Sequence, residues 1–165
     1  MSFHHTIDVD APALERGTLC APILDRLPAW FGAGALLCAT PADIDATPTL
    51  LAHVQGNLYG FLSFKRHNTY AAEIILLGVQ PDAQSVGIGR ALLRYLEKDL
   101  HRHEVEYVHV FLPTPEQDDK HYAKTRRFFF QQGYRPMLEL PERLAANRPA
   151  LLMAKKLKGG LATLF

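Results

Sequence analysis

The segment Leu77-Gly78-Val79-Gln80-Pro81, followed by Gln84-Ser85-Val86-Gly87-Ile88-Gly89-Arg90, decides the fold predicted for this 165-residue chain. It joins an almost wholly apolar run, Tyr70–Val79, to a stretch in which apolar residues recur at helical spacing. Continuous apolar runs are typical of strands that are covered on both faces. The segment is therefore predicted to be a glycine-rich turn between a central strand and a long helix.

The start of that helix has the properties of an anion-binding site. The first N–H groups of a helix have no acceptor within the helix, and the helix dipole makes this end partly positive. Glycine at positions 87 and 89 would let the backbone approach a phosphate without a clash from Cβ. Leu92 replaces the third glycine of a dinucleotide-binding fingerprint, and no Gly-Lys-Ser/Thr follows for a P-loop. A tight turn without a ligand stays open as the alternative.

Upstream of this turn, the sequence predicts a β-hairpin preceded by short helices. Thr49–Gln55 and Leu58–Lys65 are β-prone runs separated by Gly56-Asn57, a two-residue hairpin signal. Proline interrupts the first 50 residues repeatedly, so helices there must be short, and the ranges 13–27 and 33–38 are the candidates.

Downstream of the turn, helices and strands alternate. The long helix begins at Gly87 and has one apolar face, formed by Ile88, Leu92, Tyr95, Leu96 and Leu100. A strand, a loop, a second helix and two closing strands follow at Glu106–Leu112, Pro113–Asp119, Lys120–Gln132, Tyr134–Leu140 and Ala150–Leu157. This order indicates a single α/β domain over residues 1–165, a mixed sheet with helices on its faces.

Composition and charge indicate a globular protein in a reducing compartment. Hydrophobic residues make up 48% and charged residues 21%, and the formal net charge of +1 gives no general reason to expect nucleic acid or a membrane as partner. The longest apolar runs fall far short of the roughly 20 residues that span a bilayer. The N-terminus lacks the pattern of a secretory signal, and Cys20 and Cys38 form no disulfide framework, so a cytoplasmic location is expected.

Two stretches of the chain resemble one protein family. Leu77–Leu93 resembles the signature of the GCN5-related N-acetyltransferase (GNAT) superfamily, and Tyr122–Tyr134 is similar to the last helix of that family, which leads into Gly-Phe/Tyr. Ile23–Gly32 and Phe61–His67 resemble stretches of a bacterial subgroup, which identifies no substrate. The resemblance implies a mixed, mostly antiparallel central sheet with helices on both faces.

The resemblance further implies acetyl-coenzyme A (acetyl-CoA) as the cofactor. In the family, the amides of a Gln/Arg-x-x-Gly-x-Gly/Ala loop hold the pyrophosphate, and the preceding strand pairs with the pantetheine amides as if the cofactor were an added strand. Carried over residue by residue, the pantetheine positions are Leu77 and Val79, and the pyrophosphate positions are Gln84, Val86, Gly87, Ile88, Gly89 and Arg90.

Glu73 is the predicted general base. It precedes Gln84 by 11 residues, which is where the histone-acetylating branch of the family carries its base. A carboxylate on an apolar strand is expected to have a raised pKa, which suits proton acceptance near neutral pH. The alternative is a structural ion pair with Lys65 or Arg66.

A proton donor for the leaving thiolate is harder to assign. Many relatives carry a tyrosine four residues before the glycine of the second match, where this chain has Phe129, which cannot donate a proton. Tyr122 lies two helical turns earlier on the same face and is the candidate to reach the sulfur or the substrate, with packing beneath the sheet as the alternative. For the thioester carbonyl, the resemblance implies an oxyanion donor, a backbone N–H near Leu77 or Gly78 that a bulge leaves unpaired.

Other reactive side chains are given no catalytic part. Cys20 and Cys38 lie outside the segments that would flank the thioester, which favours direct attack by the amine. Three cations either meet the 3′-phosphate of the cofactor or form a solvated helix face: Lys124, Arg126 and Arg127. No metal site is expected from four histidines that span separate elements without ligand spacing: His101, His103, His109 and His121.

These motifs predict an N-acetyltransferase that moves an acetyl group from acetyl-CoA to a primary amine of a small molecule or a protein. Because of Phe129, the alternative is a non-catalytic member of the same fold that binds acetyl-CoA as a sensor or interaction module. The acceptor is expected among residues 18–38, the hairpin around Gly56 and the loop Pro113–Asp119, where sequences vary freely. A monomer or a homodimer is expected.

Overall fold

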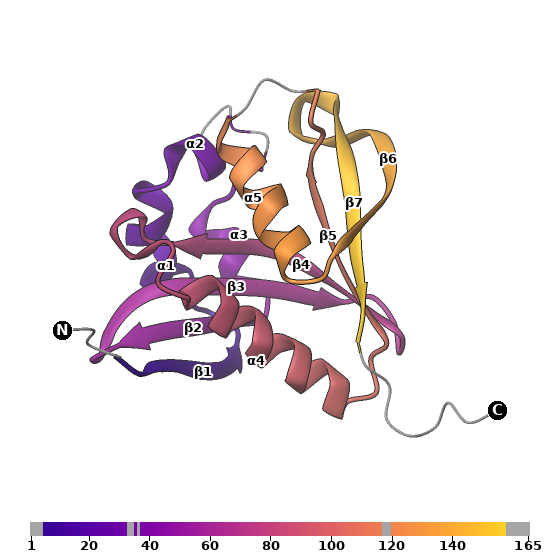
Figure 1. Ribbon diagram of the computed structural model, residues 1–165. Helices are drawn as coiled ribbons and strands as arrows, with labels where there is room; N and C mark the ends of the chain where they lie inside the picture. The colour runs from indigo at the N-terminus through magenta and orange to yellow at the C-terminus, as the bar shows by residue number, and fades with distance from the viewer. Residues whose placement is uncertain (1–4, 33–34, 36, 117–119, 158–165) are drawn as a thin grey trace.

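The computed structural model describes residues 5–32, 35, 37–116 and 120–157. Within these residues, seven strands form one sheet in the order β1-β2-β3-β4-β5-β7-β6 (Figure 1). Only β4 and β5 run parallel to each other, and all other neighbours are antiparallel. The mixed, mostly antiparallel sheet is therefore confirmed. The strands are β1 Ile7–Ala13, β2 Thr49–Val54, β3 Asn57–Arg66, β4 Ala71–Val79, β5 Tyr107–Pro113, β6 Arg135–Leu144 and β7 Arg148–Lys156.

Helices cover both faces of the sheet (Figure 1). The larger core lies between the sheet and two helices, where Leu96 and Phe129 pack against strand side chains. A second core on the opposite face contains Ile23 and Phe61. The helices are α1 Gly17–Asp25, α2 Pro28–Phe31, α3 Pro41–Asp45, α4 Ile88–Arg102 and α5 Lys120–Gln131, with 3-10 turns at Pro81–Ala83 and Ala145–Asn147.

The two long helices begin and end close to their predicted positions. The buried face of α4 consists of apolar residues at helical spacing, as the sequence indicates. The α5 helix ends before Gly133, whose φ of 96° lies in the left-handed region that stops a helix. The closing strands β6 and β7 also form, and β6 extends beyond the predicted Leu140 as far as Leu144.

The predicted hairpin forms β2 and β3, but its turn lies one residue earlier than expected. Val54 pairs with Asn57, so the two turn residues are Gln55 and Gly56. Their φ angles are 51° and 79°, and positive φ at both central residues is the requirement of the type I′ turn that connects twisted strands. Glycine takes the second central position, and Asn57 starts the next strand.

The centre of the sheet separates into two parts. The parallel pairing of β4 with β5 ends at Ile74 and Val110, and beyond this point the two strands diverge (Figure 1). On the other side of β4, the register with β3 shifts between Ser63 and Phe64, which leaves Ile75 as the extra residue of a bulge. The bulge bends β4 where it leaves β5, and it opens a gap between the strands.

The amino-terminal region differs most from the prediction. Ile7–Ala13 forms β1, which pairs with β2, whereas no strand was expected before Thr49. The helix predicted over 13–27 is shorter than expected and covers only Gly17–Asp25. Ala13 is the last residue of β1, and a separate helix, α2, begins at Pro28. The helix predicted over 33–38 includes positions 33, 34 and 36, and the loop predicted over 113–119 includes positions 117–119. These positions lie outside the described residues. Among the described helices, none is long and apolar enough to cross a membrane.

Candidate active site

The glycine-rich turn ends in a helix N-terminus with unpaired amides. Gly87 caps α4 with a φ of 97°, a left-handed conformation that glycine adopts without strain. The first hydrogen bond of α4 runs from the N–H of Ala91 to the carbonyl of Gly87 at 2.9 Å. The N–H groups of Ile88, Gly89 and Arg90 precede it and have no acceptor within the helix.

The side chains of the predicted phosphate loop point in different directions. Val86 is 63% exposed, whereas Ile88 is buried in the larger core. Neither side chain is among the cleft lining, so these two residues would meet a ligand there through their backbone. Gln84 is exposed, and its Nε2 donates to the carbonyl of Val79 at 3.2 Å. This bond folds the loop back onto the end of β4.

A cleft of about 600 Å³ opens beside this turn. Leu77 and Val79 contribute one side of it, the turn contributes a second, and α2 and α5 contribute the rest. A Cβ at position 89 would lie 3.2 Å from the ring of Phe128, so glycine there lets α5 approach the turn closely. The lining consists of Leu27, Trp30, Phe31, Leu77, Val79, Ala83, Gln84, Ser85, Gly87, Gly89, Arg90, Lys124, Thr125, Arg127, Phe128, Gln131 and Gln132.

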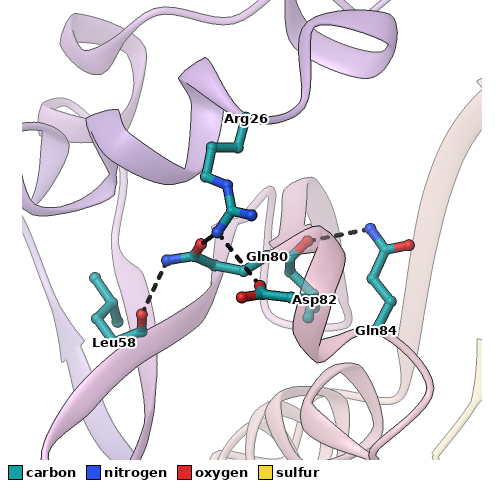
Figure 2. A network of polar contacts seen from close by, with 6 residues as sticks. Arg26, Leu58, Gln80, Asp82 and Gln84 are labelled. Atoms are coloured by element: carbon teal, nitrogen blue, oxygen red, sulfur yellow. Dashed lines mark hydrogen bonds and ion pairs between the residues drawn. The ribbon is translucent and has the colours of Figure 1, made fainter.

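A polar network fixes the β4–α4 connection to the rest of the fold (Figure 2). Arg26, just after α1, donates from Nη1 to Oε1 of Gln80, and the same nitrogen lies 3.3 Å from Oδ1 of Asp82. Gln80 in turn donates from Nε2 to the carbonyl of Leu58 at 3.3 Å. The network ties α1 and β3 to the connection. Because Arg26 and Asp82 are exposed, we expect it to orient the loop more than to stabilise the fold.

One edge of β4 presents backbone groups to the gap between the strands. Gln80 donates its N–H to a carbonyl of β3 at 2.8 Å. Residues of an antiparallel strand face alternate neighbours, so Gly78 also faces β3, while Leu77 and Val79 face the opposite edge. That edge has no described partner in β5 beyond Ile74. Of the two N–H groups considered as oxyanion donors, the geometry favours that of Leu77.

The family model for the acetyltransferase (GNAT) family matches residues 25–134 of the chain. The chain belongs to the GNAT acetyltransferase family. The matched range contains the diverging strands, the turn and every residue named above for the cleft lining. No curated protein matches the sequence of this GNAT protein.

Solved structures of acetyltransferases share this fold over almost the whole chain. The ribosomal-protein-S18-alanine N-acetyltransferase from Escherichia coli has a TM-score of 0.74 at 15% identity, covering 97% of this chain and 99% of that chain. The protein yncA from Salmonella typhimurium, solved with its cofactor acetyl-CoA, has a TM-score of 0.67 at 18% identity, covering 95% and 97%. The aminoglycoside 6′-N-acetyltransferase from Enterococcus faecium has a TM-score of 0.67 at 17% identity, covering 93% and 98%. At these identities, the likeness establishes the fold.

In this GNAT protein, Glu73 lies on β4 just before the strands diverge, and it is 6% exposed. Its Oε2 lies 2.6 Å from Nε2 of His67 and 3.8 Å from Nε2 of His109. Its Oε1 lies 3.5 Å from Nη2 of Arg143, on β6. Glu73 is not part of the cleft lining; it lies in the paired part of β4, whereas the predicted cofactor turn follows the other end of the same strand.

The surroundings of Glu73 lower its pKa, and the predicted rise is wrong. Burial acts to raise this pKa and is the largest single influence, but the polar contacts of His109 and His67 and the charge of Arg143 together outweigh it. The sequence showed only the apolar strand around the carboxylate. The polar neighbours of Glu73 come from the β3–β4 connection, β5 and β6, and neither Lys65 nor Arg66 is among the ion-pair partners described for it.

The predicted proton donor, Tyr122, is completely buried in α5. Its hydroxyl donates to the carbonyl of Trp30 in α2 at 2.8 Å, and it does not line the cleft. This geometry agrees with the packing role that the sequence left open. Phe129 is also buried, with its ring centroid 5.2 Å from that of Tyr134, while the neighbouring Phe128 lines the cleft.

The predicted cations separate into two groups. Lys124 and Arg127 line the cleft on its α5 side. Arg126 instead donates from Nη1 to the carbonyl of Pro113 at 2.9 Å and joins α5 to β5. Of the four histidines considered for a metal, only His109 lies beside Glu73.

Two residues that contact Glu73, His67 and Arg143, were not predicted from the sequence as part of the site. His67 lies six positions before Glu73, across the short connection between two strands, which is a signal that could have been used. Arg143 comes from a distant strand and carries no signal in the sequence.

Proposed function

We propose that this GNAT protein transfers the acetyl group of acetyl-CoA to a primary amine by direct attack of the amine. One observation carries the proposal: the cleft joins the amide-rich turn to the edge of β4 at the point where the strands part. The turn would take the diphosphate, and the strand edge would take the pantetheine arm. Acetyl-CoA supplies the activated acetyl group.

The residues of the cleft suit this cofactor. The N–H groups that precede Ala91 lack acceptors in the helix, and Lys124 and Arg127 add positive charge on the α5 side. Leu77 and Val79 offer successive backbone groups on one strand edge, which is the arrangement that strand addition requires.

The chemistry is assigned to two groups on β4. The N–H of Leu77 stabilises the negative charge that develops on the carbonyl oxygen. Glu73 accepts the proton that the amine loses, and His67, hydrogen-bonded to it at 2.6 Å and 36% exposed, gives this proton a route to solvent. As the carbon–sulfur bond breaks, the thiolate takes a proton from water, because the described cleft lining holds no tyrosine.

Glu73→Gln tests the assignment of the base. We expect thiol release from acetyl-CoA, measured with a panel of small amines, aminoglycosides and lysine peptides, to fall by about 10²–10⁴-fold. The affinity for acetyl-CoA, measured by calorimetry, should stay unchanged, because Glu73 lies outside the cleft lining.

Glu104→Gln is the matched control, because Glu104 is exposed after the end of α4. It should leave both thiol release and cofactor affinity as they are. Full activity of the Glu73→Gln variant on an accepted amine would show that another group accepts the proton.

A non-catalytic acetyl-CoA-binding module is the second candidate. The buried Phe129, which stands where many relatives carry a tyrosine, favours it. Saturable binding of acetyl-CoA without thiol release for any amine of the panel would support this candidate over transfer.

A further inference from the structure

Three side chains that can ligate a metal converge on the sheet face beside the gap. Among the described residues, His67, Glu73 and His109 form the group whose ligand atoms all lie within 4.8 Å of one another. They come from the β3–β4 connection, β4 and β5, and the parallel register pairs Glu73 directly with His109. The two imidazole rings are stacked, with centroids 5.5 Å apart and planes 14° from parallel.

The orientation of the three groups suits one shared ion. Both histidines direct Nε2 at the same carboxylate oxygen, Oε2 of Glu73, at 2.6 Å and 3.8 Å. In a tetrahedral site with bonds of about 2.0 Å, neighbouring ligand atoms lie roughly 3.3 Å apart. The two observed distances bracket this value, so small movements of the side chains would admit an ion.

The neighbours of the three groups resemble the outer contacts of a metal site. The second carboxylate oxygen, Oε1, lies 3.5 Å from Arg143, which leaves Oε2 to the histidines. The rings of Phe111 and His109 form an edge-to-face pair with centroids 5.5 Å apart, and Arg143 lies over the ring of Phe111. Glu73 is buried, whereas the side chain of His67 is 36% exposed, so one side of the group is open to solvent.

We propose that His67, Glu73 and His109 bind one divalent first-row transition metal ion, with Zn²⁺ as the ion that two imidazoles and a carboxylate suit best. Ligation uses the Nε2 lone pairs, so both rings carry their proton on Nδ1 in the bound form. The three protein ligands leave one position for water or for another ligand.

A bound ion also has a consequence for transfer, which rests on the proposed function. The ion occupies the oxygen of Glu73 and the nitrogen of His67 that would otherwise accept and pass on the amine's proton. Zn²⁺ is therefore expected to inhibit acetyl transfer, and a chelator is expected to restore it.

Metal binding is tested first without cofactor or amine. Co²⁺ is added to the full chain, and the visible absorption of tetrahedral Co²⁺ is followed, with Zn²⁺ then added as competitor. We expect saturation at one Co²⁺ per chain and displacement by Zn²⁺. Mg²⁺ and Ca²⁺, which prefer oxygen ligands, should not displace Co²⁺.

His67→Gln, His109→Gln and Glu73→Gln should each abolish the Co²⁺ absorption. His101→Gln is the control, because His101 is exposed on α4 and is not one of the three proposed ligands. This variant should bind Co²⁺ as the unsubstituted protein does. Circular dichroism of every variant checks the fold, and each folded variant must also lose the rise in melting temperature that Zn²⁺ gives the parent. Absence of one-to-one binding, or binding that survives in folded His67→Gln and His109→Gln, would overturn the metal site.

Acetyl transfer measured with and without Zn²⁺ distinguishes a failure of this inference from a failure of the proposed function. Transfer that proceeds and is insensitive to stoichiometric Zn²⁺ would reject the inhibition and leave the transferase assignment intact. Metal binding with no transfer to any amine would reject the transferase assignment and leave the metal site intact.

Discussion

Gly87 is the residue on which the conformation of the proposed cofactor turn depends most directly. Its φ of 97° is costly for any residue with a Cβ, although a Cβ there would meet only Ile7, at 3.9 Å. We therefore expect Gly87→Ala to lower the free energy of unfolding by about 1–2 kcal/mol through the backbone alone. The strained turn should also misplace its amides and weaken acetyl-CoA binding, which urea unfolding and calorimetry would measure.

Gly56→Ala provides the matched control for this change. Gly56 has a φ of 79°, and nothing lies within 4 Å of a Cβ built there, but it sits in the β2–β3 turn and not in the cleft lining. The control should lose similar stability and keep its affinity for acetyl-CoA. Equal affinity of both variants for acetyl-CoA would contradict a role for the Gly87 turn in binding.

The two cysteines are expected to differ in reactivity. Burial raises the pKa of the Cys20 thiol to about 12, against the smaller opposing influence of Arg16. The thiolate is the reactive form, so Cys20 is unreactive at about pH 8, whereas Cys38 is exposed. Iodoacetamide should add one group to the folded protein, at Cys38, and two in urea, as intact mass would show. Two additions at one rate in the folded state would disprove this.

The residues of the site differ in how far the sequence could predict them. The turn is local: Gln84, Gly87 and Gly89 are neighbours in the chain, so their spacing alone is enough to predict an anion-binding turn. The surroundings of Glu73 are not local. His109 lies beside it because β4 and β5 run parallel in one register, and Arg143 reaches it from β6, so the direction of the pKa shift depends on contacts that are distant in the sequence.

At the scale of elements, Tyr122 connects α5 to α2. Its buried hydroxyl donates to the carbonyl of Trp30, and Tyr122→Phe would remove that donor. We expect a loss of about 0.5–1.5 kcal/mol in the free energy of unfolding, because a part-buried hydrogen bond is removed. The rate of thiol release at saturating substrate should change little, since the hydroxyl does not line the cleft.

Tyr107→Phe is the control for this change, because Tyr107 is 43% exposed on β5. It should alter neither stability nor rate. A large loss of rate in Tyr122→Phe with stability unchanged would instead assign Tyr122 to catalysis.

Elements with a strong period were predicted well, and short or edge elements were not. The apolar face of α4 is buried as expected. The strand β1 has the alternating sequence Ile7-Asp8-Val9-Asp10, with the acidic residues exposed, yet Pro12 and the two acids argue against a strand on propensity alone. It forms because β2 offers an edge to pair with, which is information that lies outside the segment.

At the scale of the whole molecule, the proposed cofactor would join the two parts of the sheet. The turn and Leu77 belong to the part with β1 to β4, whereas Lys124, Arg127 and Phe128 lie on α5, which follows β5. A ligand in the cleft contacts both parts and stabilises the folded state by mass action. At a concentration 100 times the Kd the gain is about 2.7 kcal/mol. For a chain of this size we expect a rise in melting temperature of about 5–10 °C.

S-acetylpantetheine, which lacks the diphosphate and the nucleotide, separates the contributions of the cleft to this shift. It retains the groups that the edge of β4 would bind and loses those that the turn, Lys124 and Arg127 would bind. At equal concentration it should raise the melting temperature by much less than acetyl-CoA does. The Gly87→Ala variant should lower the shift given by acetyl-CoA and leave the small shift given by S-acetylpantetheine unchanged. Equal shifts from the two ligands would mean that the turn contributes nothing to binding, and the anion-binding role of the α4 N-terminus would have to be abandoned.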